Sequence, residues 1–246
     1  MENTVFAGLD EAGRGSVIGP MIIAGVSLER KDEARLNALG VKDSKELSPT
    51  QRERLAKEIE KVAKDIVIVN LSACRIDNMR KGGINLNRIE AMKFADILNI
   101  LTPGVAFVDC PDVNPERLTL ILKKMLKAPG QLVVEHKADS RYPICSAASI
   151  IAKVTRDREV RKLHKKYGDF GPGYSSNEKT MAWLREWLET KGDYPEIVRK
   201  GWITAKELKN ERAQKGLGGF FRKLVGKEEG CEPKERAEEA AGAFPE

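Results

Sequence analysis

The sequence predicts an α/β fold in which helices flank a mixed β-sheet and a purely helical segment follows. Five strand-like runs rich in Val, Ile and Ala alternate with amphipathic helical patterns. The three runs nearest the N-terminus are joined locally, which favours a mixed sheet over a purely parallel one. After residue 177 only helical patterns occur, so the sheet is expected to be complete by then.

The expected strands have the short length and β-branched composition typical of sheet interiors. They cover residues 4–10, 17–28, 65–72, 104–110 and 131–137. A glycine-rich turn at residues 13–15 joins the first two.

The clearest helix start lies in the stretch 47–64. Ser48 is a suitable N-cap, Pro49 suits the first helical position, and Gln51 completes a capping box. Further helices are expected at residues 75–81, 85–101, 115–127, 143–167, 178–190 and 195–213. From Lys215 onward the chain is rich in Gly, Glu, Lys and Ala with little to bury, which predicts disorder.

Composition limits the class of protein. The 246 residues suffice for one core and a small appendage, and 41% hydrophobic with 33% charged residues is typical of a soluble globular protein. No apolar run is long enough to span a bilayer, and "MENTVF" lacks the layout of a signal peptide, so we expect a cytoplasmic protein. The net charge of +6 suits a polyanionic partner such as nucleic acid. The four cysteines lack the paired spacing of a zinc site or a disulfide framework.

Acidic residues follow three of the strand-like runs. Asp10, with Glu11 beside it, lies at the end of the run 4–10, and Asp109 lies at the end of the run 104–110. Asp139 follows the run 131–137 after a short extension. Ligands of open α/β sheets bind at strand ends, so the four carboxylates are expected to converge. Consecutive strand residues face opposite ways. We therefore expect the chain to bend directly after Asp10, with Gly13 and Gly15 permitting the bend.

Four adjacent carboxylates remain ionised only if cations neutralise them. All-oxygen ligands without a His or Cys cluster predict Mg²⁺ or Mn²⁺, and pairs of such ions promote in-line phosphoryl displacement. The alternative for any single aspartate is a turn former or a helix N-cap. We assign Asp43 and Asp112 to that class.

Several motifs then carry a family resemblance. "GLDEAGRGSVIGPMIIAGV", "VKDSKELSP", "NLNRIEAMKFA", "FVDCPDV", "EHKADSRYPICSAASIIAKVTRDRE" and "YGDFGPGY" occur in that order. Over residues 4–205 the sequence resembles ribonuclease HII, especially its archaeal branch. The resemblance implies a ribonuclease H-like fold with a five-stranded mixed sheet and a helical C-terminal lobe. It divides the chain into a catalytic domain (1–176), the lobe (177–213), a peptide (214–221) and a disordered tail (222–246).

The resemblance also implies an activity and a set of residues. The activity is endonucleolytic cleavage of RNA in RNA/DNA hybrids and at ribonucleotides within duplex DNA, with water attacking the phosphate 5′ of the ribonucleotide. Products carry 3′-hydroxyl and 5′-phosphate ends. The metal ligands correspond to Asp10, Glu11, Asp109 and Asp139, which would hold two ions. A monomer is implied.

The same resemblance implies which residues bind the substrate. The backbone of Gly13, Arg14 and Gly15 would sense the 2′-hydroxyl that separates RNA from DNA. Tyr174 would pack on the sugar at the junction. Lys45, Lys153 and Arg156 would contact phosphates. For Lys153 and for the basic run 158–166, a solvated helix face is the alternative, and His136 and His164 are expected to be structural.

The segment 214–221, "QKGLGGFF", resembles the sliding-clamp-binding peptide of replication and repair enzymes. In that mode Leu217, Phe220 and Phe221 would fill an apolar pocket of the clamp and Gln214 would bind beside it. Two adjacent exposed phenylalanines are otherwise an aggregation liability. The alternative is that both fold back onto the helical lobe.

Two other functions would leave different marks in the sequence. A non-catalytic module that binds hybrids or clamps would be marked by loss of one of the four carboxylates, and none is missing. A different phosphoryl-transfer enzyme would need a nucleotide-binding loop, and no G-x-x-x-x-G-K-[ST] pattern occurs.

Overall fold

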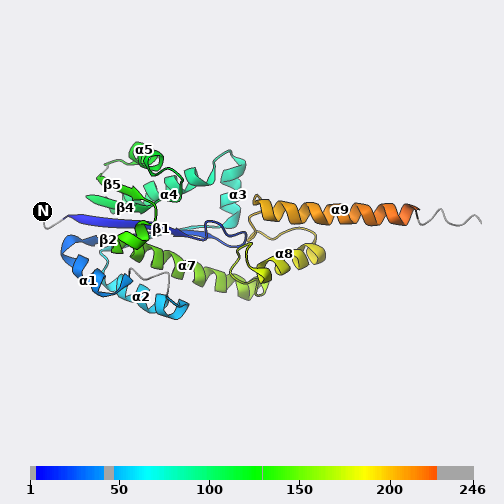
Figure 1. The fold of residues 1–246 in the computed structure, drawn as a ribbon, viewed down its shortest axis with the longest axis horizontal. Helices are drawn as coiled ribbons and strands as arrows, with labels where there is room; N and C mark the ends of the chain where they lie inside the picture. The colour runs from blue at the N-terminus through cyan, green and yellow to red at the C-terminus, as the bar shows by residue number, and fades with distance from the viewer. Residues whose placement is uncertain (1–3, 42–46, 129, 226–246) are drawn as a thin grey trace, which may run out of the picture.

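The fold is a five-stranded sheet between two layers of helices, with a helical lobe at one end (Figure 1). The computed structural model describes residues 4–41, 47–128 and 130–225, and side chains as far as Gln214. The strands are β1 (Val5–Ala12), β2 (Met21–Glu29), β3 (Asp65–Leu71), β4 (Val105–Asp109) and β5 (Gln131–Glu135). The helices are α1 (Glu33–Ala38) after the 3₁₀ turn η1 (Arg30–Asp32), α2 (Pro49–Val62), α3 (Ala73–Lys81), α4 (Leu86–Leu101), α5 (Pro115–Met125), α6 (Ala138–Arg141), α7 (Pro143–Tyr167), α8 (Glu178–Lys191) and α9 (Ile203–Val225).

The sheet is mixed, as the sequence predicts. Its strand order is β3-β2-β1-β4-β5, with β1 in the centre. β2 runs antiparallel to both β1 and β3, whereas β4 runs parallel to both β1 and β5. The carboxyl ends of β1 and β4 therefore lie side by side, which is the edge where the acidic residues occur.

Each face of the sheet buries its own hydrophobic core. α7, α1 and α2 cover one face, and α4, α3 and α5 cover the other (Figure 1). α7 lies directly against β1: a Cβ built on Gly8 would come within 2.3 Å of the Ile144 backbone. This close approach is possible because glycine has no side chain.

The helical lobe has a separate core that reaches back into the first part of the chain. Phe170 and Leu184 pack there with Val17 and Ile18. The segment after α8 pairs with the segment before β2, because Ile18 bridges Val198 and the Gly19 amide donates to the Ile197 carbonyl at 2.8 Å. The lobe is thus attached to the turn that follows β1.

This attachment explains two differences from the expected boundaries. The strand expected at 17–28 begins only at Met21, because residues 17–19 pair with the lobe instead of the sheet. The helix expected at 195–213 begins at Ile203 for the same reason. It also continues to Val225, so the expectation of disorder from Lys215 is wrong as far as residue 225. Residues 226–246 lie outside the described part of the chain.

Two helix predictions are confirmed. Ser48 caps α2 through the full capping box with Gln51, with Pro49 at its start, and α7 covers the expected residues 143–167.

In the described ranges no helix is both long and apolar enough to cross a membrane. The division of the chain after residues 176, 213 and 221 stays a prediction.

Candidate active site

Asp10 and Glu11 lie in β1 itself. The strand runs straight on to Ala12, with Asp10 opposite Ala24 and Glu11 opposite Ile23 of β2, so the expected bend after Asp10 is wrong. The two side chains point to opposite faces of the sheet, since strand residues alternate. β4 ends at Asp109, so β1 has no paired strand on that side beyond Leu9.

Asp109 and Asp139 approach this strand end from two further elements. Leu9 pairs with Val108, which places Asp109 beside Asp10. The Asp109 Oδ1 accepts a 2.7 Å hydrogen bond from the Ala138 amide at the start of α6. Asp139 is the next residue of that short helix and is 5% exposed. The short extension that we expected before it is a turn at residues 136–137, because β5 ends at Glu135.

The electrostatics show that these carboxylates share one environment. Burial, followed by the charge of Asp109, raises the pKa of Asp10 to about 7. Burial and then the charges of Asp10, Glu90 and Asp109 raise the pKa of Glu11 well above its usual range. Burial, together with the charges of Asp10, Asp109 and Asp139, also raises the pKa of the Cys145 thiol. Negative charge from three separate elements is therefore concentrated here.

The donor set fits hard divalent cations in chemistry. The ligands are carboxylate oxygens, and the buried Glu11 Oε2 has no hydrogen-bond partner. Within the described residues, however, no three Asp, Glu, His or Cys side chains are already arranged to hold a metal ion. The carboxylates that converge here would therefore have to turn toward a cation on binding.

A fifth acidic residue, missed in the sequence, lies beside the four. Glu90 of α4 is fully buried and forms an ion pair with the Arg14 Nε at 2.9 Å. The Arg14 Nη2 also donates to the Asn87 Oδ1 at 2.6 Å. Burial raises the pKa of Glu90 to about 7, although Arg14 opposes the shift. The Arg14 side chain is therefore held against α4, and the sequence had given it no such partner.

Arg156 connects the turn at 13–15 with Tyr174. Its guanidinium lies 4.7 Å from the Tyr174 ring centre, and its Nη2 donates to the Pro172 carbonyl at 2.9 Å. A Cβ on Gly13 would come within 2.2 Å of the Arg156 Nε. Arg156 is only 4% exposed, so it supports these two loops and is not presented to phosphate.

The loop that carries Tyr174 is also tied to the segment between β1 and β2. The Gly173 carbonyl accepts hydrogen bonds from the Val17 and Ile18 amides at 2.8 and 3.0 Å. Tyr174 is half-buried rather than fully exposed at a tip. The structure thus brings Gly13, Arg14, Gly15 and Tyr174 to one region next to the carboxylates.

The basic residues divide into two groups. Lys153 of α7 is half-buried, and its charge is among the smaller influences on Asp10, whose pKa burial mainly raises. Arg158 and Arg161 bind Glu53 of α2, which agrees with the alternative of a solvated helix face. Lys45, like Asp43, lies outside the described residues.

The remaining candidates have structural contacts. The Asp112 carboxylate accepts from the Asn114 amide at 3.4 Å, as expected of a turn former. His136 lies 3.3 Å from the Cys110 carbonyl, and His164 lies 2.9 Å from the Gly171 carbonyl. Gln214 is exposed on α9, whereas the side chains of Leu217, Phe220 and Phe221 lie outside the described part.

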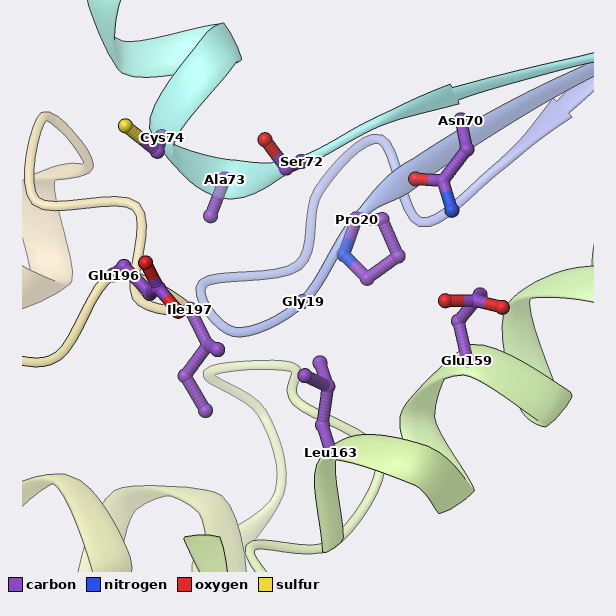
Figure 2. Close-up of a pocket in the computed structure, with 10 residues that line it drawn as sticks. All are labelled: Gly19, Pro20, Asn70, Ser72, Ala73, Cys74, Glu159, Leu163, Glu196 and Ile197. Carbon is purple, nitrogen blue, oxygen red and sulfur yellow. The ribbon is translucent and has the colours of Figure 1, made fainter. Parts of the chain in front are cut away.

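The pocket drawn in Figure 2, of about 310 Å³, contains none of the four carboxylates. It lies between α7, the start of α3 and the segment that carries Glu196 and Ile197 (Figure 2). The carboxylates occupy the end of the sheet instead.

Comparison with known proteins agrees with this geometry. The family model of ribonuclease HII matches residues 7–205. Ribonuclease HII of Pyrococcus abyssi is 47% identical over 222 residues, which is 89% of this chain and 98% of that protein. The structure of ribonuclease H2 from Pyrococcus horikoshii OT3 matches with a TM-score of 0.79 at 44% identity, covering 84% of this chain and 98% of that one.

A second solved structure is that of the complex between PCNA and ribonuclease HII from Archaeoglobus fulgidus. It matches with a TM-score of 0.75 at 46% identity and covers 80% of this chain and 95% of that one. The predicted ribonuclease H-like fold is thereby confirmed. The extent and identity of these matches exceed what a shared fold requires. This chain belongs to the ribonuclease HII family.

Proposed function

We propose that this protein is an endoribonuclease that hydrolyses RNA in RNA/DNA hybrids and cuts 5′ of ribonucleotides embedded in duplex DNA. The observation that carries the proposal is the convergence of Asp10, Glu11 and Asp109 in a buried, negatively charged strand end. Removal of RNA primers and of misincorporated ribonucleotides is the corresponding role. Family membership supports the same substrate class.

We further propose that two Mg²⁺ or Mn²⁺ ions are held by Asp10, Glu11, Asp109 and Asp139. Such ions, when bound, supply charge for the attacking and leaving oxygens of a phosphoryl displacement. The raised pKa values of Asp10 and Glu11 support this assignment, because burial and mutual repulsion disfavour their ionised forms until a cation is present. The hydrolysis would leave 3′-hydroxyl and 5′-phosphate ends.

The other residues of the site would position the nucleic acid. The 13–15 turn lies beside the carboxylates, and Gly15 is exposed there. A bare backbone can approach a ribose closely enough to sense one 2′-hydroxyl. Tyr174, supported by Arg156, would pack on the sugar at the junction. Lys153 would meet a phosphate near Asp10, and Lys45 would contact another.

Residues 214–221 would bind a sliding clamp. The related ribonuclease HII of Archaeoglobus fulgidus has been solved with PCNA, which supports the proposal for this chain. Gln214, the first residue of the peptide, is exposed and so accessible. Gly216, Gly218 and Gly219 weaken the end of α9, since glycine costs about 1 kcal/mol relative to alanine in a helix interior.

The test is cleavage of a duplex with one ribonucleotide, mapped to the nucleotide with Mg²⁺ and Mn²⁺ compared. Asp109→Asn should abolish cleavage and spare duplex binding. Asp112→Asn is the matched control, because its amide oxygen can still accept from the Asn114 amide. Normal cleavage by Asp109→Asn would show that the metal-site assignment is wrong.

A further inference from the structure

Arg199 is a fully buried charged side chain that lies outside the site residues predicted from the sequence. It lies in the segment between α8 and α9 and donates three hydrogen bonds, each to a main-chain carbonyl. The Nη2 donates to Gly13 at 2.6 Å, the Nη1 to Arg14 at 2.7 Å and the Nε to Gly19 at 3.2 Å. A buried charge is tolerated only when it is well hydrogen-bonded, and guanidinium can reach three acceptors from fixed directions.

The backbone of the same segment is bonded to the same region. The Arg199 amide donates to the Val17 carbonyl at 2.9 Å. The Trp202 ring lies 4.9 Å from the Arg199 guanidinium and restricts it from the other side. Arg199 therefore connects the helical lobe to the 13–15 turn through its side chain and to the adjacent Val17 through its main chain.

The position of these carbonyls determines where the adjacent amides point. In a trans peptide the C=O of one residue and the N–H of the next point in opposite directions. Because the Gly13 and Arg14 carbonyls point toward Arg199, the N–H groups of Arg14 and Gly15 point away from it. Gly15 is exposed, so its side of the turn is open to a ligand.

Hydrogen bonds and core packing together hold this junction. Gly19, whose carbonyl accepts from Arg199, and Ile197, which bonds to the Gly19 amide, both line the pocket of Figure 2. Val17, Ile18, Ile197 and Val198 also pack together in the lobe core, and Arg199 adds its three hydrogen bonds to this packing.

We propose that Arg199 is a positioning residue for ribonucleotide recognition: it fixes the 13–15 turn so that the amides of Arg14 and Gly15 face the 2′-hydroxyl. The inference rests on the proposed function, because it assumes that this turn reads the sugar. It assigns to the helical lobe a part in selecting the substrate, beyond covering one end of the sheet.

The experiment compares Arg199→Lys with the wild-type protein in Mg²⁺. One measurement is the KM for a duplex with a single ribonucleotide, and the other is the Ki of the all-DNA duplex of the same sequence as a competitor. Lysine keeps the charge but cannot reach three carbonyls in a fork. We expect the ratio of Ki to KM to fall about tenfold, with Ki itself within about twofold of the wild-type value.

Leu184→Ala is the control for a merely structural role. Leu184 is fully buried in the lobe core. Its truncation should lower the Tm of the protein but leave the ratio of Ki to KM unchanged. An unchanged ratio of Ki to KM in Arg199→Lys, or a fall of the same size in Leu184→Ala, would overturn the inference. Neither result would contradict the proposed cleavage at ribonucleotides.

A second pair of variants covers the case in which Arg199→Lys does not fold. Trp202→Leu removes the aromatic face beside the guanidinium but leaves its hydrogen bonds, and Trp202→Phe keeps an aromatic ring. We expect Trp202→Leu to lower the ratio and Trp202→Phe to preserve it; equal ratios would contradict the inference. A wild-type protein that does not cleave the ribonucleotide-containing duplex would instead overturn the proposed function, and this inference with it.

Discussion

Arg14 and Glu90, which are 76 residues apart in the chain, form a partly buried ion pair at the edge of the candidate active site. Glu90 is fully buried, and burial raises its pKa while Arg14, and then Arg199, favour its charged form. Removing one partner of such a pair leaves a buried charge uncompensated, which costs more than the pair contributes.

Arg14→Ala should therefore destabilise the protein, by about 1–3 kcal/mol in urea unfolding. Adding Glu90→Gln to Arg14→Ala should recover most of that loss, because the uncompensated carboxylate is then absent. Purely additive losses in the double mutant would show that the two side chains are not coupled.

Gly13 and Gly15 should differ sharply in their tolerance of alanine. Gly13 has φ +81°, and a Cβ there would meet the Arg156 Nε at 2.2 Å and the Pro20 carbonyl at 2.7 Å, whereas a Cβ on Gly15 would meet nothing within 4 Å. Gly13→Ala should lower the Tm and activity together. Gly15→Ala should keep the Tm but raise the KM for a ribonucleotide-containing duplex. If Gly15→Ala cleaved normally, close approach of its backbone to the sugar would be disproved.

Asp10→Asn should raise the stability of the metal-free protein while removing its response to metal. Asp10 is buried and its ionisation is opposed by burial and by Asp109. An amide of the same shape lacks that charge, so unfolding in EDTA should cost about 1–3 kcal/mol more than in the wild type. Excess MgCl₂ should raise the Tm of the wild type only.

The control for this experiment is Asp96→Asn, since Asp96 is 56% exposed on α4 and pairs with Lys93. It should leave both the Tm and the response to MgCl₂ close to the wild-type values. A lower Tm of Asp10→Asn in EDTA would mean that the Asp10 carboxylate stabilises the fold, against our expectation.

The sheet and most helices were predictable because their signals are local. Alternating apolar runs and the capping box at Ser48 depend on neighbouring residues only, and both agree with the structure. The start of β2 was not predictable in this way. Residues 17–19 have a strand-like sequence, but they pair with the lobe, and that choice depends on residues almost two hundred positions away.

The candidate site likewise contains residues that the local sequence predicts and residues that it does not. Asp10, Glu11 and Asp109 were recognisable because an acidic residue after an apolar run is unusual. Glu90 left a weaker signal, namely a charged residue among the apolar positions Ile89, Ala91 and Phe94 of α4. Arg199 left none, because its burial depends on carbonyls of the 13–15 turn and not on its own neighbours.

Asp193 should make the stability of the lobe depend on pH. Hydrogen bonds from Lys209 and then Lys200 lower its pKa below the usual range. A carboxyl whose pKa is lowered by folding stabilises the protein above its unfolded pKa of about 4, and that contribution is lost as the pH falls further. Because the group is exposed, the effect should stay below about 1 kcal/mol.

Asp193→Asn should accordingly be less stable than the wild type in urea at neutral pH, and the difference should shrink in strong acid. Lys209→Met added to Asp193→Asn should cost little more, since the partner is already lost. A difference that grew in acid would have the wrong sign for this mechanism.

Clamp binding should depend on the side chains of residues 214–221 and, separately, on whether their backbone can unwind. Phe220→Ala with Phe221→Ala should abolish capture by an immobilised sliding clamp, because the two rings would supply most of the buried apolar surface. Lys215→Ala is the matched control within the same helix and should be captured normally. Undiminished capture of the double mutant would disprove the clamp peptide.

The backbone requirement follows from the helical state of residues 214–221. If the clamp takes this segment in an unwound form, the helix must open on binding, and its glycines make that opening easy. Gly218→Ala with Gly219→Ala should strengthen the helix by about 1 kcal/mol per residue and weaken capture about tenfold or more. Circular dichroism of the variant should show the added helix, and unchanged capture would mean that the clamp binds the segment without unwinding it.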